Sequence, residues 1–150
     1  MSKPLTLVMT AAVMDLLHEG HLNLLQKMRD RGHLTLVILH DGFTTFRNKR
    51  KLPIENLEKR TRNLIDTGLV DIIRYTFAES PDCQIEDVWA DFRLNNRGSI
   101  NGESAWNIVF MRGDDWADFP GRETLEQLDV PIEFVPYTKG ISTSKLRLKL

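Results

Sequence analysis

The residues with the clearest chemical potential are two histidines, His18 and His21, which enclose Gly20. They follow an apolar run over 5–13 and precede a helix that we expect over about 20–31. Where a buried strand turns into a helix, free N–H groups and the positive end of the helix dipole attract phosphate. Two imidazoles at that point would add hydrogen-bond donors for phosphate oxygens and would stabilise developing charge. The alternative is a solvated turn that contains two histidines by chance.

A second group of residues lies near the C-terminus. Gly140 is followed by Ile141, Ser142 and Thr143. Glycine permits close approach of a ligand, and the hydroxyls and free N–H groups at a helix start suit a phosphate. In isolation, a plain helix cap is the more frequent explanation of such a sequence.

A third group is Asp114, Asp115 and Trp116, directly after an apolar run over 107–111. The carboxylates could accept hydrogen bonds from a nucleotide or hold Mg²⁺. The alternative is an acidic turn whose Trp116 packs on the core.

The elements that must position these groups alternate along the chain. Buried strands are expected over 5–12, 34–39, 70–75, 107–111 and 132–135, and helices over 20–31, 54–67, 81–94, 122–128 and 142–149, with a loop over 95–103. This alternation predicts an α/β, Rossmann-like doubly wound domain with a five-stranded parallel sheet, built from the single domain 1–150. Ligands of such sheets bind beyond the carboxyl ends of the strands, so the three groups should meet at one edge.

Composition narrows the classes of protein further. The 150-residue chain has no apolar run long enough to span a membrane and no signal-peptide layout, and Cys83 is its only cysteine. We therefore expect a cytoplasmic protein with no membrane partner. A formal net charge of −1 argues against a nucleic-acid partner, although basic residues gather over 47–62 and 139–150 and could form a local anion site.

Taken together, the motifs resemble the cytidylyltransferase family along nearly the whole chain. H-x-G-H follows the first predicted strand, and a lysine-rich loop follows the second. G-D-D-W follows the fourth predicted strand, and G-I-S-T-S follows the fifth. The closest likeness is to the glycerol-3-phosphate cytidylyltransferase branch. The resemblance implies a homodimer that combines CTP with a small phosphorylated alcohol, glycerol 3-phosphate first, and releases a CDP-alcohol and pyrophosphate. It also implies Mg²⁺, held through the nucleotide phosphates and not by direct protein ligands.

The same resemblance assigns site residues. The catalytic residues would be His18, His21 and Lys51. The nucleotide would contact Ala12, Val13, His18, His21, Lys49, Asp114, Trp116, Thr138, Gly140, Ile141, Ser142 and Thr143. The acceptor side would be formed by Asp15, Asp41, Lys51 and Arg60, with Asp15 also supporting the histidine turn.

Three departures from the family pattern keep alternatives open. Val13 replaces a hydroxyl residue, and Gly68 and Tyr137 stand where the family has arginines that bind phosphate. A non-catalytic nucleotide-binding protein is therefore one alternative. The segment 51–60 also resembles the matching loop of heptose-1-phosphate adenylyltransferases, so adenylyl transfer to a sugar 1-phosphate is another. A structural or interaction module, including one whose basic loop binds nucleic acid, would require the motifs to be coincidental.

Overall fold

The computed structural model describes residues 5–42, 52–94, 106–114 and 119–136. Its five strands form one sheet in the order β3-β2-β1-β4-β5, and every neighbouring pair is parallel. The strands are β1 (Leu5–Ala12), β2 (Leu34–His40), β3 (Ile72–Thr76), β4 (Trp106–Gly113) and β5 (Ile132–Val135). The predicted five-stranded parallel sheet is confirmed.

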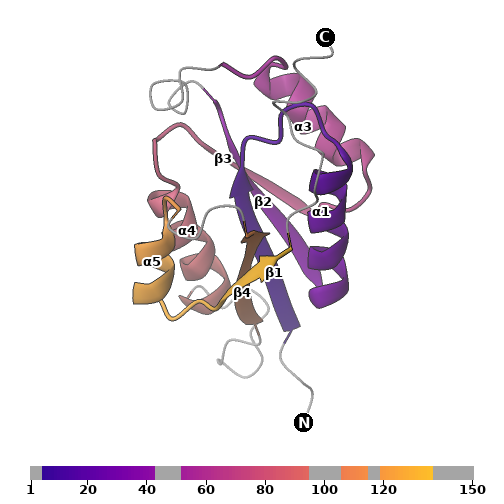
Figure 1. Ribbon diagram of the computed structural model, residues 1–150. Helices are drawn as coiled ribbons and strands as arrows, with labels where there is room; N and C mark the ends of the chain where they lie inside the picture. The colour runs from indigo at the N-terminus through magenta and orange to yellow at the C-terminus, as the bar shows by residue number, and fades with distance from the viewer. Residues whose placement is uncertain (1–4, 43–51, 95–105, 115–118, 137–150) are drawn as a thin grey trace.

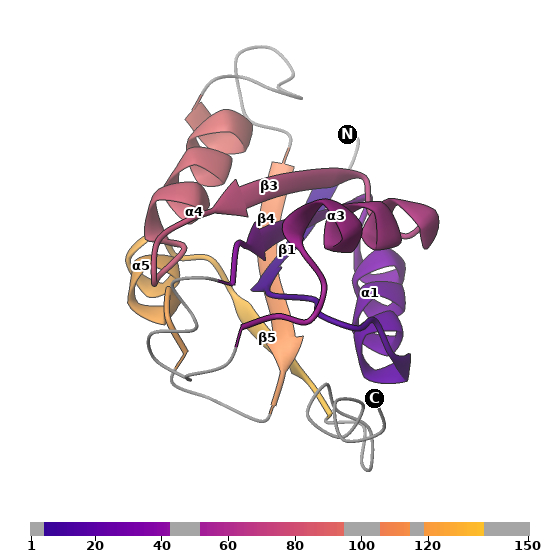
Figure 2. The ribbon, with the colours of Figure 1, turned by 90° about the horizontal axis from the view of Figure 1, so that it is seen from above.

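Helices cover both faces of this sheet (Figures 1 and 2). One face carries α1 (Glu19–Arg31) and α3 (Leu57–Asp66), and the other carries α4 (Asp82–Trp89) and α5 (Arg122–Gln127). Successive residues of β1 point to opposite faces, so Leu7 and Met9 join the core under α4 and α5, whereas Val8 joins the core under α1 and α3. In the part of the chain that the structure describes, no helix is long and apolar enough to cross a bilayer.

The strand order places the site. The chain passes from β1 to β2 and β3 on one side, and then adds β4 and β5 on the other side of β1. The carboxyl ends of β1 and β4 therefore flank the point where the strand order reverses, which is where doubly wound sheets bind ligands. The turn after β1 and Asp114 after β4 both lie at this edge.

Two helices differ from the prediction by more than one residue at an end. The helix expected from Ile54 begins at Leu57, because the amides of Ile54 and Glu55 bind the Asp15 carboxylate instead and Asn56 caps the helix through Lys59. The helix expected over 81–94 divides into α4 and a π-helix, η1 (Ala90–Leu94). The loop expected over 95–103 and the helix expected over 142–149 lie outside the described residues.

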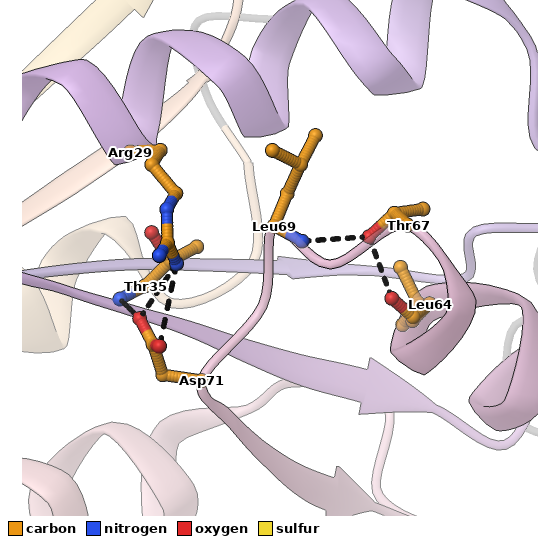
Figure 3. Close-up of polar contacts among 6 residues, drawn as sticks. All are labelled: Arg29, Thr35, Leu64, Thr67, Leu69 and Asp71. Carbon is orange, nitrogen blue, oxygen red and sulfur yellow. Dashed lines mark hydrogen bonds and ion pairs between the residues drawn. The ribbon is translucent and has the colours of Figure 1, made fainter.

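The turn between α3 and β3 is held by side chains on the amino edge of the sheet (Figure 3). The Thr67 hydroxyl donates to the Leu64 carbonyl at 2.6 Å and accepts from the Leu69 amide at 3.1 Å. The Asp71 carboxylate accepts from the Thr35 amide at 2.8 Å and pairs with Arg29 of α1 at 3.3 Å. Gly68 lies in this turn, so it is at the opposite edge of the sheet from the turn after β1.

Candidate active site

His18 and His21 cap α1 through their own side chains. His18 is the N-cap residue, and its Nδ1 accepts from the Gly20 amide at 3.0 Å. The Nδ1 of His21 accepts from the His18 amide at 3.3 Å, which completes a reciprocal capping box. The two rings stack with their centroids 3.9 Å apart.

This arrangement fixes what the histidines can do for a ligand. Because Nδ1 of each ring accepts a backbone hydrogen bond, the proton of the neutral ring lies on Nε2, which leaves an N–H donor on both rings. Burial lowers the pKa of His18, and burial together with the neighbouring His18 lowers the pKa of His21 to about 4, against an opposing effect of Asp15. Near neutral pH the site therefore presents two neutral donors at a helix N-terminus, a suitable environment for phosphate.

The backbone that leads into this pair is strained. Met14 and Leu16 have φ values of 56° and 50°, in the left-handed region that side chains disfavour. Each such residue costs roughly 1–2 kcal/mol, so the surrounding contacts must hold the turn in place.

A pair of carboxylates supplies those contacts. The buried Asp15 carboxylate accepts from the Ile54 amide at 2.8 Å and from the Glu55 amide at 3.0 Å. In return, the Glu55 carboxylate accepts from the Leu16 amide at 2.9 Å and from Asn63 at 3.1 Å. The turn 13–17 and the segment 52–56 are therefore joined in both directions.

Arg60 lies beneath the same turn, with 1% of its surface exposed. Its Nη1 donates to the carbonyls of Val13 at 2.8 Å and His40 at 2.6 Å, its Nη2 to Asp41 at 2.6 Å, and its Nε to Glu55 at 3.0 Å. One guanidinium thus ties together the end of β1, the end of β2 and the segment before α3. Backbone carbonyls take four of its five N–H donors and the side chain is almost fully buried, so the structure leaves little of Arg60 for an acceptor phosphate, and that role stays a prediction.

The charges around Arg60 oppose one another. Burial lowers the pKa of Arg60, whereas the carboxylates of Asp15, Asp41 and Glu55 raise it. Arginine keeps its proton in proteins, so it remains a cation that offsets part of this negative charge.

The other predicted residues fall into two sets. Ala12, Val13 and Asp15 lie at the end of β1 and in the turn before the histidines, and Asp41 directly follows β2. Asp114 is exposed after the end of β4, where its amide donates to the Val135 carbonyl at 3.1 Å. The remaining predicted residues lie outside the described part of the chain: Lys49, Lys51, Trp116, Thr138, Gly140, Ile141, Ser142 and Thr143.

Sequence reasoning missed Glu55 as a site residue. It lies in a stretch that was interpreted for its basic charge, and a single carboxylate there carries no motif. Helical spacing did contain a signal for Arg60, since Leu57, Arg60 and Leu64 occur at i, i+3 and i+7 and so share the buried face of α3.

Among the described residues, no group of three or more histidine, cysteine or acidic side chains is arranged to hold a metal ion. A cavity of about 380 Å³ lies between the N-terminal ends of α4 and α5, on the opposite face from α1. It is lined by Ser80, Asp82, Phe119, Pro120, Gly121, Arg122, Glu123 and Glu126, and neither histidine reaches it.

Comparison with known proteins shows to which family of nucleotide-binding proteins the chain belongs. The family model described as Cytidylyltransferase-like matches residues 9–149. The chain belongs to this cytidylyltransferase-like family. It is 28% identical to glycerol-3-phosphate cytidylyltransferase of Bacillus subtilis (strain 168) over 141 residues, which is 93% of each chain. It is also 28% identical over 144 residues to the Staphylococcus aureus (strain NCTC 8325 / PS 47) protein of the same name, with 95% of this chain and 93% of that one covered.

A second kind of relative is longer than this chain. Bifunctional protein HldE of Coxiella burnetii (strain Dugway 5J108-111) is 26% identical over 148 residues, which is 97% of this chain but 28% of that protein. Among solved structures, the lipopolysaccharide core biosynthesis protein from Thermoplasma volcanium GSS1 matches with a TM-score of 0.61 at 18% identity, covering 91% of this chain and 99% of that one. That likeness shows the fold. The family and its curated relatives support nucleotidyl transfer as the class of reaction.

Proposed function

We propose that this protein transfers CMP from CTP to a small phosphorylated alcohol, with glycerol 3-phosphate as the first candidate, and releases pyrophosphate. The observation that carries the proposal is the stacked His18–His21 pair, which presents two neutral Nε2–H donors at a helix N-terminus beside the reversal in strand order. The likeness to the two glycerol-3-phosphate cytidylyltransferases supports the choice of substrates.

The chemistry needs no covalent enzyme intermediate. A phosphate oxygen of the acceptor attacks the α-phosphorus of CTP and forms the new P–O bond. The bond between the α-phosphorus and the bridging oxygen breaks, and pyrophosphate leaves with both electrons. Positioning and charge stabilisation are then the main contributions of the protein. His18 and His21 would donate to oxygens on which negative charge grows.

The further partners in this proposal come from the family resemblance. Lys49 and Lys51 would lower the repulsion between the two polyanions. As the resemblance implies, Mg²⁺ would be held by the nucleotide phosphates, where it would neutralise charge. We also propose a homodimer, which sedimentation analysis of the full chain would test.

A second candidate is transfer of AMP from ATP to a sugar 1-phosphate. The segment 51–60 favours it, because this stretch resembles heptose-1-phosphate adenylyltransferases, and the match to bifunctional protein HldE spans the same region. At the residue level, Val13 stands where the cytidylyltransferase pattern has a hydroxyl residue, so this chain lacks one phosphate contact that the resemblance implies.

The test is pyrophosphate release with Mg²⁺ present. CTP and ATP are each combined with glycerol 3-phosphate, phosphocholine, phosphoethanolamine and a heptose 1-phosphate. We expect release with CTP and one phosphorylated alcohol. Release with ATP and the sugar phosphate alone would replace the proposal by the second candidate. If CTP raises the melting temperature but no combination releases pyrophosphate, the protein binds nucleotide without transferring it to these acceptors.

A further inference from the structure

The turn that carries the histidines is unusual in how many separate groups hold it. Its two residues with positive φ, Met14 and Leu16, enclose Asp15. Three backbone amides donate to carboxylates here: Leu16 donates to Glu55, and Ile54 and Glu55 donate to Asp15. Charge-assisted bonds of this kind are roughly twice as strong as neutral ones, so they can hold a backbone that would otherwise relax.

Arg60 adds a second, independent support under the same turn. Its guanidinium has a rigid planar fork that lysine lacks, and this fork reaches carbonyls from three parts of the chain. The Val13 carbonyl is among them, directly before the strained residues. Two separate side chains therefore hold the turn: Arg60 donates to the Val13 carbonyl, and Glu55 accepts from the Leu16 amide.

We propose that Glu55, Arg60 and Asp15 are positioning residues for nucleotide transfer: they lock the turn 13–17 onto the end of β2 and the segment 52–56, and thereby fix the two histidine donors at the start of α1. Arg60 then acts through the backbone and does not bind the acceptor directly. This inference rests on the proposed function for its catalytic consequence, whereas the locking of the turn can be measured without turnover.

The charge in the locked unit gives the arrangement a second consequence. Asp15, Glu55 and Asp41 bring negative charge close to a site built for phosphate, and Arg60 is the buried cation among them. Loss of Arg60 would leave carboxylates beneath the nucleotide phosphates, where like charges repel. Substitution of Arg60 should therefore weaken nucleotide binding, whereas substitution of Glu55 should mainly disturb the geometry of the turn.

The first experiment compares Glu55→Ala with Glu58→Ala. Glu58 is three residues further on, and its side chain is 79% exposed and pairs only with Arg62 among the contacts of the described structure. Amide hydrogen exchange at Leu16 is measured by NMR without nucleotide, and kcat and KM are measured with the substrates found for the wild type. Because a small misplacement of reacting groups has a large effect on rate, we expect at least about tenfold faster exchange at Leu16 and at least about a tenfold lower kcat for Glu55→Ala alone.

The conservative variants separate positioning from folding. Glu55→Gln keeps an oxygen that can accept from Leu16, so it should recover part of both losses if Glu55→Ala unfolds or loses activity. Arg60→Lys keeps the charge but loses the fork, and its control is Arg62→Lys on the same helix, where the side chain is 66% exposed. We expect Arg60→Lys to accelerate exchange at Leu16, while Arg62→Lys behaves as the wild type does.

The outcomes distinguish this inference from the proposed function. A folded Glu55→Ala protein with wild-type exchange at Leu16 and wild-type kcat would overturn the inference, and so would wild-type exchange at Leu16 in a folded Arg60→Lys protein. Faster exchange at Leu16 with unchanged kcat would overturn it as well, because the turn would then not position catalytic groups. If the wild type releases no pyrophosphate in any combination, the proposed function fails. The inference is then judged by exchange at Leu16 and by the dissociation constant of CTP, which should rise at least about tenfold in Arg60→Gln, which removes the cation, and less in Arg60→Lys, which keeps it.

Discussion

Each histidine of the pair has two nitrogen atoms with separate tasks. Nδ1 satisfies a backbone amide at the start of α1, and Nε2 is left to donate outward. One side chain thus serves both the stability of a helix and the chemistry at its end. The two tasks can be separated by substitution, since asparagine offers an acceptor near the place of Nδ1 but nothing near the place of Nε2.

For His18 this separation gives a sharp prediction. Asparagine is a good N-cap, so His18→Asn should unfold with a free energy within about 0.5 kcal/mol of the wild type, whereas His18→Ala should lose about 1 kcal/mol. Both variants should lose at least about a hundredfold in turnover, because both remove a donor to the developing charge. Urea unfolding and steady-state kinetics provide the two measurements.

His33 offers the control for this comparison. It is an exposed histidine whose Nδ1 also accepts a backbone amide, from Thr6 at 3.0 Å, but it lies at the amino edge of the sheet. His33→Asn should keep full turnover. Wild-type turnover in a folded His18→Asn protein would remove His18 from the catalytic assignment.

At the scale of the elements, the connection after β2 depends on a glycine. Gly42 is buried with a φ of 89°, and a Cβ atom built on it would lie 2.2 Å from Cγ of Pro53. The close approach of these two segments brings 52–56 against the turn after β1. Gly68 offers a natural comparison, because it has a φ of 70° but nothing within 4 Å of the same position.

The two glycines should therefore respond differently to alanine. Gly68→Ala incurs only the cost of a left-handed alanine, about 1 kcal/mol, while Gly42→Ala adds overpacking that typically costs about 1–3 kcal/mol more. Free energies of unfolding from urea titrations would measure both. Gly42→Ala should also lower turnover by displacing the segment 52–56. Equal losses of stability in the two variants would contradict the close contact with Pro53.

At the scale of the whole molecule, the half-buried His21 makes stability depend on pH. The ordinary pKa of histidine is 6.5, and the pKa of His21 in the folded state is lowered to about 4. Between these values the unfolded chain binds a proton that the folded protein does not. The stabilisation is therefore complete above pH 6.5 and is lost as the pH falls toward 4.

We expect this effect of His21 to amount to about 1–2 kcal/mol at pH 5. The measurement is urea unfolding at pH 7.5 and pH 5 for the wild type and for His21→Asn, which keeps an acceptor for the His18 amide. The variant should lose less stability between the two pH values, since the carboxylates and the other histidines titrate in both proteins. An equal loss would show that His21 is not protonated on unfolding in this range.

The sequence was sufficient to predict most of the fold for a physical reason. Strands of a parallel sheet covered by helices appear as continuous apolar runs, and 5–12 and 132–135 were located to the residue, although β5 is an edge strand that is only partly buried. The start of α3 was misplaced by three residues, because a tertiary contact with Asp15 takes the amides of 54 and 55 out of the helix. No local pattern carries that information.

The site was predictable where a motif carries the chemistry and not where the fold assembles it. H-x-G-H indicated a histidine pair at a helix start, and the structure places the pair there. The roles of Glu55 and Arg60 depend on partners up to 47 positions away, such as the Val13 carbonyl. Helical spacing places Arg60 on the buried face of α3, but arginine is rarely buried, and the spacing does not name the carbonyls that the guanidinium binds.

The central position of β1 has a consequence for synthesis of the chain. Leu5 of β1 pairs with Trp106 of β4, 101 positions later. The partner strand on the other side, β2, lies within the first 40 residues of the chain. While the ribosome makes the intervening sequence, one side of β1 has backbone groups with no strand beside them, and such an open edge invites association with other chains. Molecules in the course of translation should therefore be most prone to aggregate, and most dependent on chaperones, in the interval that ends when β4 emerges.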